Sequence, residues 1–184
     1  MSEAAWRVIA REGLDRASMR AIAQEMDCTT GVVTHYFRNK QELILFALHQ
    51  VTERLRGQMD VAITNLSGVD RLVAMLLSFL PLDQTRQEIL QVWVAFLGYA
   101  VGRQDLMVEH RHSAGELRKV VIQELAALQK QQIIRSDIDP AIEANVLLAL
   151  VNGISLDTLI QSQPLDSKQQ KIALQRYVSG LLNH

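Results

Sequence analysis

The sequence predicts an all-α protein of about nine helices, and three observations support that prediction. Apolar residues recur at helical spacing along nearly the whole chain of 184 residues. Nine glycines and three prolines are few for a chain that would need the many turns of an all-β architecture. The breaks between periodic stretches carry helix caps and stops, such as Gly13, Asn39 and the pair Asp139-Pro140.

Composition narrows the class of protein further. Hydrophobic residues make up 48% of the chain, which is enough for a real core. The single cysteine, Cys28, excludes an internal disulfide framework and argues against a thiolate metal cluster. The N-terminus lacks the pattern of a signal peptide, and no uninterrupted apolar run reaches the roughly 18 residues of a membrane span. We therefore expect a cytoplasmic protein with no membrane partner, no metal and no cofactor.

Local signals divide the first fifty residues into three short helices and the start of a long one. Gly13 supplies a left-handed stop for the first helix. Ser18 can cap a second helix, and Thr29 opens a short third one. Asn39 caps the longer helix, with Glu42 three residues on to complete a capping box. These elements form a compact first unit.

The remainder of the chain predicts five more helices, separated by Asn, Ser, Gly and Pro. The helix that follows Asp139-Pro140 is apolar on more than one side, which is typical of a helix covered in a bundle core or against another subunit. The last helix carries an apolar stripe on one face. The expected spans are about 69–81, 84–103, 105–132, 140–161 and 167–182.

Residues 18–37 hold the pattern that points to a function: two helices joined by a tight turn. In a helix-turn-helix the first helix braces the second, whose N-terminal residues face base edges in the major groove of DNA. Small and polar residues are needed there because the backbone must approach closely, and the second helix supplies them as Thr29, Thr30, Gly31 and Thr34. A short helix packed inside a bundle is the alternative interpretation.

The side chains of this short helix divide between DNA and the core. Thr29 and Thr30 can reach phosphates or bases, and Gly31 leaves room for a sugar-phosphate strand. The methyl groups of Val32 can meet a thymine methyl. We expect Val33 and Phe37 to point inward.

The residues Ser18-Met-Arg-Ala-Ile-Ala and Thr29-Thr-Gly-Val-Val-Thr-His-Tyr-Phe-Arg-Asn-Lys-Gln-Glu-Leu resemble the DNA-binding region of the TetR/AcrR family of bacterial repressors. The stretch 31–40 is similar to the subgroup that includes the betaine-synthesis repressor, and 92–96 resembles the sensor domain of that subgroup. The close match covers residues 1 to about 50. The resemblance implies a DNA-binding helix-turn-helix domain over 1–50, with its motif at about 18–37, and an effector-binding and dimerisation domain over 51–184.

The resemblance also assigns residues to DNA contacts. It puts Lys40 at a phosphate contact and Arg20 near the groove, at the start of the bracing helix. Thr34 departs from the family, which commonly has an aromatic residue there. The full DNA-binding set expected is Arg20, Thr29, Thr30, Gly31, Val32, Thr34, Tyr36 and Lys40.

The C-terminal domain is expected to bind a small effector and to dimerise through the last two helices. Residues that can line an effector pocket are Trp93, Phe96, Tyr99, Met107 and Asn152, although helical spacing alone fits plain core equally well. The expected dimer contacts are Leu150, Leu174, Tyr177, Val178 and Leu181. Asp157 can bind a cationic effector, pair across the dimer or face water. His110 and His112 do not predict a metal site, because residues two apart on a helix point to different faces.

Together these features favour a ligand-responsive transcriptional regulator, a repressor released from its DNA operator by a small molecule. The alternative is a helical dimeric interaction module that has lost DNA binding. Its support is the start of the chain, which lacks the basic residues that the family usually carries ahead of the first helix; either the numbered start is truncated or binding relies on fewer phosphate contacts. An enzyme is not expected, since no phosphate loop, acid–base carboxylate pair or zinc-ligand spacing is present.

Overall fold

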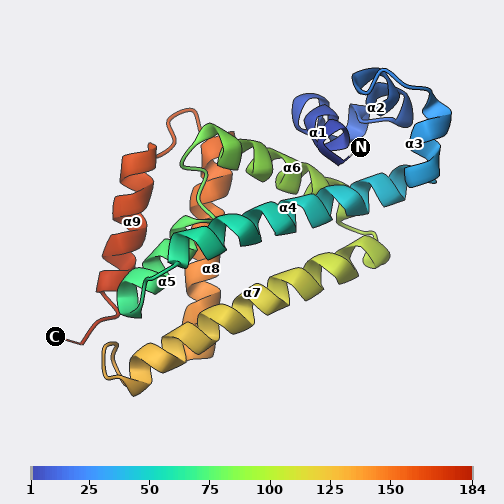
Figure 1. Ribbon diagram of the computed structural model, residues 1–184. Helices are drawn as coiled ribbons and strands as arrows, with labels where there is room; N and C mark the ends of the chain where they lie inside the picture. The colour runs from blue at the N-terminus through green and yellow to red at the C-terminus, as the bar shows by residue number, and fades with distance from the viewer. Residues whose placement is uncertain (1, 184) are drawn as a thin grey trace. The chain divides into compact units, whose positions relative to one another are not determined.

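The computed structural model describes residues 2–183 and places nine α-helices in that range (Figure 1). The one strand-like feature in those residues is an isolated antiparallel bridge between Ile134 and Leu182. The all-α prediction is therefore confirmed. The helices are α1 Ser2–Arg16, α2 Met19–Glu25, α3 Thr30–Tyr36, α4 Lys40–Ile63, α5 Gly68–Leu77, α6 Gln84–Ala100, α7 Gln104–Lys130, α8 Pro140–Ile160 and α9 Ser167–Ser179.

Side-chain caps fix where most of these helices begin. Asp139 precedes α8 and its carboxylate accepts from the backbone N–H groups of Ala141 and Ile142, at 2.7 and 3.2 Å. Asp166 precedes α9 and forms a reciprocal capping box with Gln169. Each cap satisfies backbone donors that have no partner inside the helix. Such local signals explain why the predicted helix starts agree with the structure.

Gly13 introduces a kink into α1. Its backbone angles are φ 77° and ψ 165°, a region that residues with a Cβ atom rarely occupy. The chain then makes one further helical turn to Arg16 before α2 begins. The predicted stop at Gly13 is thus a sharp bend within one helix.

The chain packs as two compact units. The first contains residues up to Arg54 together with 88–110, and the second contains 55–87 together with the residues from 111 onward. This grouping places most of α6 with the N-terminal helices, whereas the sequence put the domain boundary near residue 50.

In the first unit, α2 packs against both α1 and α3. Apolar side chains from all of its helices form the core, among them Ile9, Ile22, Val33, Ile44 and Phe96. Trp6 is also buried, and the guanidinium carbon of Arg54 lies 4.4 Å from the centre of its ring. Arg54 also donates to the carboxylate of Glu3 at 2.7 Å, so this pair joins α1 to α4.

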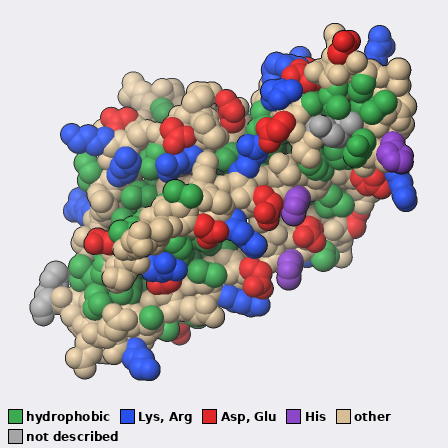
Figure 2. Space-filling view, in the orientation of Figure 1, with side chains coloured by type: hydrophobic (Ala, Val, Ile, Leu, Met, Phe, Trp, Pro, Cys, Tyr) green, Lys and Arg blue, Asp and Glu red, His purple; other side chains and the backbone are tan. Residues whose placement is uncertain are grey.

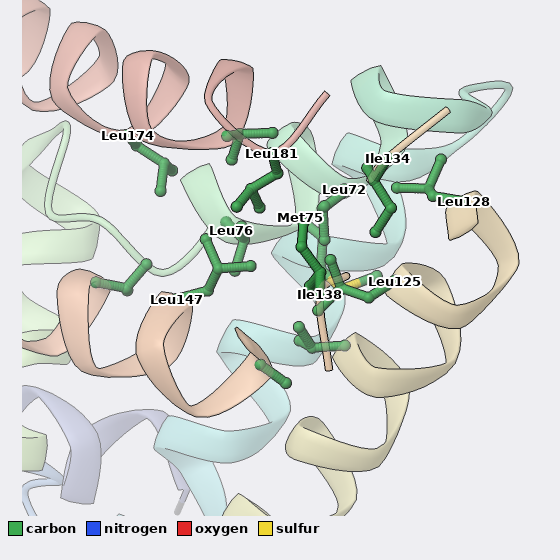
Figure 3. Close-up of a cluster of buried hydrophobic side chains, with 14 of the residues drawn as sticks. Leu72, Met75, Leu76, Leu125, Leu128, Ile134, Ile138, Leu147, Leu174 and Leu181 are labelled. Atoms are coloured by element: carbon green, nitrogen blue, oxygen red, sulfur yellow. The ribbon is translucent and has the colours of Figure 1, made fainter. Parts of the chain in front are cut away.

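In the second unit, α5, α8 and α9 pack against one another in pairs. Figure 3 shows the cluster at their junction, where Met75, Leu76, Leu147 and Leu174 point toward a common centre. The last residues of the chain close the unit, because the N–H of Asn183 donates to the carbonyl of Ile133 at 3.0 Å. The C-terminal strand-like segment is therefore part of the fold.

Helix α8 differs from its neighbours in how much apolar surface it leaves uncovered. Within residues 2–183 it is the one helix long and apolar enough to cross a membrane, judged by length and composition alone. The sequence predicted no membrane-spanning segment because no uninterrupted apolar run is long enough. The average hydropathy over an 18-residue window, by contrast, selects α8. Only 22% of its most apolar 18-residue window is buried inside the single chain. Apolar side chains also reach the surface in the part of Figure 2 that contains α5, α8 and α9.

Candidate nucleic-acid interface

The α2–turn–α3 segment forms because each of its breaks has a local cause. The hydroxyl of Ser18 accepts from the N–H of Ala21 at 3.1 Å and so begins α2, as predicted. Asp27 has a positive φ of 51° and reverses the chain, and the N–H of Cys28 then donates to the carbonyl of Ala23 at 2.9 Å. Thr29 precedes α3 in an extended conformation, without a side-chain cap. The result is a tight turn between two short, packed helices.

Helix α3 has one buried side and one exposed side. Val33 is fully buried and Phe37, just after the helix, is 7% exposed, which confirms that both point inward. Because successive residues are 100° apart around a helix, the centre of the opposite side is formed by Gly31 and His35, and Val32 lies to one side of them. All of residues 29–32 and 34–36 are exposed. The segment predicted to contact DNA is therefore a surface ridge and not part of a bundle core.

Two side chains of α3 have internal contacts that orient them. The hydroxyl of Thr34 donates to the carbonyl of Gly31 at 3.1 Å. The rings of His35 and Tyr36 meet edge to face, with centroids 5.7 Å apart. His35 was absent from the predicted DNA-binding set. With 3.6 residues per helical turn, His35 falls opposite Val33, and this spacing could have placed it on the exposed side of α3.

Lys40, the first residue of α4, has a structural role in this conformation. Its ammonium donates to the carbonyls of Leu14, Asp15 and Ala17, at 2.5, 3.1 and 2.7 Å. An ammonium has three protons, and three carbonyls at the end of α1 take them. In this conformation all three protons of Lys40 are donated inside the chain, and its phosphate contact stays a prediction.

Asn39 and Glu42 hold the start of α4 in a slightly different way from the predicted capping box. The amide oxygen of Asn39 accepts from the N–H of Glu42 at 2.9 Å, as expected. The carboxylate of Glu42 accepts from the N–H of Arg38 at 2.8 Å, one residue earlier than the box requires. The connection between α3 and α4 is thus fixed at both ends.

The arginines of this unit fall into paired and unpaired groups. Arg7 and Arg11 both donate to Glu25, at 2.8 and 2.9 Å, and these hydrogen bonds lower the pKa of the Glu25 carboxyl. By contrast, the guanidinium groups of Arg16 and Arg20 have no hydrogen bond or ion pair to any residue in 2–183, and both side chains are exposed. Arg16 ends α1, just before the α2–turn–α3 segment, and Arg20 lies in the first turn of α2.

Comparison with known proteins decides what this segment is. Residues 2–46 match the family described as "Bacterial regulatory proteins, tetR family", and residues 68–183 match "BetI-type transcriptional repressor, C-terminal". The chain belongs to the TetR family. It is a DNA-binding transcriptional regulator with a BetI-type C-terminal domain, and this family is not enzymatic.

Curated TetR relatives match along nearly the whole chain. The HTH-type transcriptional regulator PksA of Bacillus subtilis (strain 168) is 28% identical over 183 residues, which cover 98% of this chain and 87% of that protein. The HTH-type transcriptional regulator BetI of Vibrio vulnificus (strain YJ016) is 25% identical over 178 residues, covering 95% and 87%.

Solved structures show the same fold. A transcriptional regulator from Rhodococcus sp. Rha1 has a TM-score of 0.84 and 25% identity, covering 98% of this chain and 92% of that one. A putative transcriptional regulator from Saccharomonospora viridis, solved in complex with choline, has a TM-score of 0.91 and 19% identity, covering 100% and 96%.

Four of the residues predicted to line the effector pocket of this TetR-family chain lie in the first unit. Phe96 is buried there, and Trp93, Tyr99 and Met107 are half-buried. The rings of Trp93 and Phe96 lie 6.2 and 6.0 Å from the ring of His110, so these three side chains are grouped.

Two of the other predicted pocket residues, Tyr99 and Asn152, do not join this group. The face of Tyr99 is covered by the guanidinium of Arg103, 4.0 Å from the ring centre. Asn152 is exposed on α8 and belongs to the second unit.

The predicted dimer contacts lie differently from expectation. Leu174, Val178 and Leu181 are at most 5% exposed and belong to the chain's own core, so a second copy cannot cover them (Figure 3). Leu150 and Tyr177 are half-buried against the same core. The dimer contacts stay a prediction, and an apolar stripe that packs on α5 and α8 looks the same in sequence as one that packs on a partner.

One side of α8 is apolar but exposed in the single chain, and we call it the outward stripe of α8. Ile142, Val146 and Ile160 are 64, 40 and 72% exposed and lie on one side of the helix. Ala149 and Gly153 lie between them on that side, and both are exposed. Ala144, Leu147 and Val151 occupy the opposite side and are buried.

Proposed function

We propose that this TetR-family regulator is a dimeric repressor that binds an operator through α3 and releases it when a small cationic effector binds. The observation that carries the proposal is the division of α3. Val33 and Phe37 anchor the helix to its unit, while every side chain from Thr34 to Tyr36 is exposed. A helix held in this way presents its outer side to the major groove, which is the arrangement a helix-turn-helix requires.

Phosphate contacts are assigned in this proposal to free guanidinium groups. Arg20 and Arg16 have exposed guanidiniums with no partner in the part of the chain that the structure describes, and the side chain of Arg38 is in the same state. A guanidinium can donate two parallel hydrogen bonds to a phosphate. Each such contact releases condensed counterions from DNA and strengthens the salt dependence of binding.

Dimerisation is assigned to the outward stripe of α8. An exposed apolar stripe of this length on a helix is costly in water and is covered in most soluble proteins. Ala149 and Gly153 at its centre allow a second helix to approach closely. Two-fold symmetry would place the same stripe of two copies against each other, with the two α3 helices about 34–36 Å apart, one turn of DNA.

We propose that the effector is a small organic cation. The compartment is the cytoplasm, where such a regulator meets both DNA and metabolites. The related structure from Saccharomonospora viridis holds choline. In this chain Trp93 and Phe96 lie near His110, and aromatic faces attract quaternary ammonium groups. Effector binding must weaken DNA binding by the same factor by which DNA weakens effector binding.

The decisive experiment is selection of duplex DNA from a random library, followed by fluorescence anisotropy on the selected duplex at two salt concentrations. The proposal expects one enriched sequence with two related half-sites and an affinity that falls steeply as salt rises. The alternative, an interaction module that has lost DNA binding, predicts no enrichment even at low salt.

Choline is the probe for the effector. Calorimetry should detect its binding, and adding it should reduce DNA affinity about 5–150-fold, the range of common allosteric couplings. Trp93→Ala should weaken choline binding, and Trp93→Phe, which keeps an aromatic face, should restore part of it. If millimolar choline neither binds nor changes DNA affinity, the proposal of a choline-like effector is wrong, while the DNA-binding proposal remains open to its own test.

A further inference from the structure

We propose that α3 recognises a thymine methyl group in a slot above Gly31, with Val32 and His35 as its walls. This inference rests on the proposed function, since it names the chemistry by which the operator is recognised. Gly31 and His35 form the centre of the exposed side of α3, opposite the buried Val33, and Val32 is exposed beside them.

The packing inside the protein does not explain the glycine at position 31. A Cβ atom built there would meet only the hydroxyl oxygen of Thr29, at 3.6 Å, which is an ordinary contact. Gly31 lies within helix α3 and not in the left-handed region where a glycine is needed. Alanine is the better helix former, so glycine lowers the stability of α3. What the glycine provides is open space on the outer side of the helix.

The walls of this space are suited to an apolar group. Val32 is 44% exposed and presents only carbon atoms. His35 is three residues further on and is therefore its neighbour on the helix surface. The edge-to-face contact with Tyr36, at 5.7 Å, holds the imidazole ring to one side. A methyl group that enters above Gly31 would be within reach of both the valine and the imidazole ring, which are neighbours on the helix surface.

The other side chains of the ridge favour the same chemistry. Residues 29–36 contain no Arg, Lys, Asn, Gln, Asp or Glu, the residues that make directional hydrogen bonds to guanine, adenine and cytosine. The hydroxyl proton of Thr34 is donated to the carbonyl of Gly31, at 3.1 Å. Apolar contact with the 5-methyl group of thymine is the specific contact that Val32 offers in the major groove, beside the hydroxyl groups of Thr29 and Thr30.

The test replaces each thymine of the selected duplex by deoxyuridine, one at a time, which removes only the 5-methyl group. We expect one position in each half-site at which the replacement weakens binding about fourfold, the effect of exposing one methyl-sized group. At that position Val32→Ala should remove most of the difference between thymine and uracil. Val61→Ala, at an exposed valine of α4 that is 78% accessible, should leave the difference unchanged.

A second variant tests the slot itself. Gly31→Ala should raise the melting temperature and still weaken binding to the selected duplex at least tenfold, and its own discrimination between thymine and uracil should disappear. Gly57→Ala is the matched control, because Gly57 lies on an exposed face of α4 with nothing near its missing Cβ. It should raise stability and leave DNA affinity unchanged.

The outcomes separate this inference from the function it rests on. If a duplex is selected but no deoxyuridine position changes the affinity, or if Val32→Ala keeps the full preference for thymine, the slot is wrong and the DNA-binding function stands. If no duplex is enriched at all, the function itself is overturned, and the slot with it.

Discussion

The ammonium of Lys40 donates to the carbonyl of Ala17 at 2.7 Å and thereby joins the first residue of α4 to the end of α1. The same ammonium reaches the carbonyls of Leu14 and Asp15, which follow directly on the bend at Gly13. These carbonyls have no further helical turn to accept from, so a cation is a favourable partner. The relationship fixes where α4 begins relative to α1 inside the first unit.

Replacing Lys40 should therefore reduce stability rather than salt dependence. Lys40→Ala removes three charge-assisted hydrogen bonds at a half-buried site, and we expect the free energy of unfolding in urea to fall by about 2 kcal/mol. The salt dependence of DNA binding by the folded fraction should stay the same. Lys168→Ala, at an exposed lysine of α9, is the control for loss of a lysine alone. If the slope of log affinity against log salt falls by about one in Lys40→Ala, Lys40 contacts a phosphate.

Arg20 should show the opposite behaviour. Arg20→Ala removes a free guanidinium next to the recognition segment, so it should weaken binding to all duplexes alike and reduce the slope of log affinity against log salt by about 0.9. Stability should hardly change, since no partner is lost among the described residues. Arg118→Ala, an exposed arginine of α7, serves for comparison. If the slope of log affinity against log salt is the same for Arg20→Ala and Arg118→Ala, Arg20 does not contact a phosphate.

The outward stripe of α8 gives a prediction about assembly. Val146→Glu places a charge within the proposed dimer contact, where it would be buried without a partner. Sedimentation analysis should show a dimer for the wild type and a monomer for this variant. Val61→Glu, at a more exposed valine outside the stripe, should remain a dimer. If the Val146→Glu protein is still a dimer, the interface does not lie on the outward stripe of α8.

Two glycines should respond to alanine in opposite directions. Gly13→Ala forces a Cβ atom into φ 77°, ψ 165°, and should cost about 1–3 kcal/mol of stability. Gly57→Ala, inside α4, should instead stabilise by about 0.5–1 kcal/mol, because alanine favours the helix. Thermal or urea unfolding of both variants measures the difference. If Gly13→Ala is as stable as the wild type, the bend in α1 is not a constraint on the fold.

Tyr177 makes the stability of the second unit sensitive to high pH. Burial, together with the hydrogen bond to Glu143 at 2.8 Å, raises the pKa of its hydroxyl from 10.0 to about 12. The folded state therefore favours the protonated phenol. Its contribution to stability is complete below pH 10 and is lost as the pH rises from 10 toward 12.

The variant Tyr177→Phe tests this effect. It should lose about 2 kcal/mol of stability near neutral pH, because the carboxylate of Glu143 loses its donor. The difference in stability between wild type and variant should then shrink above pH 10. Tyr36→Phe, at a tyrosine that is 59% exposed, is the control. A difference that stays constant up to pH 12 would contradict the coupling between Tyr177 and Glu143.

The helices could be predicted from the sequence because their ends are fixed by local contacts. Ser18, Asp139 and Asp166 cap the helices that follow them within three residues. The inward direction of Val33 and Phe37 was also predictable, since Phe37 follows Val33 by four residues, at the end of one short helix. In each case the residues that decide the structure are neighbours in the chain.

The remaining features depend on contacts between distant residues. Lys40 meets carbonyls that are 23 to 26 residues earlier, and nothing in its local sequence distinguishes this from a phosphate contact. The apolar stripe of α9 packs on α5 and α8 of its own chain, and composition does not reveal which apolar surface will cover a helix. The grouping of 88–110 with the N-terminal helices is likewise a tertiary property.

The most direct test of the central claim is a hydroxyl-radical footprint of the protein on its selected duplex. Two copies that each place α3 in the major groove should protect two patches whose centres are one helical turn, about 10–10.5 base pairs, apart. A single patch, or no protection at low salt, would contradict the claim that α3 of two copies forms the DNA-binding surface.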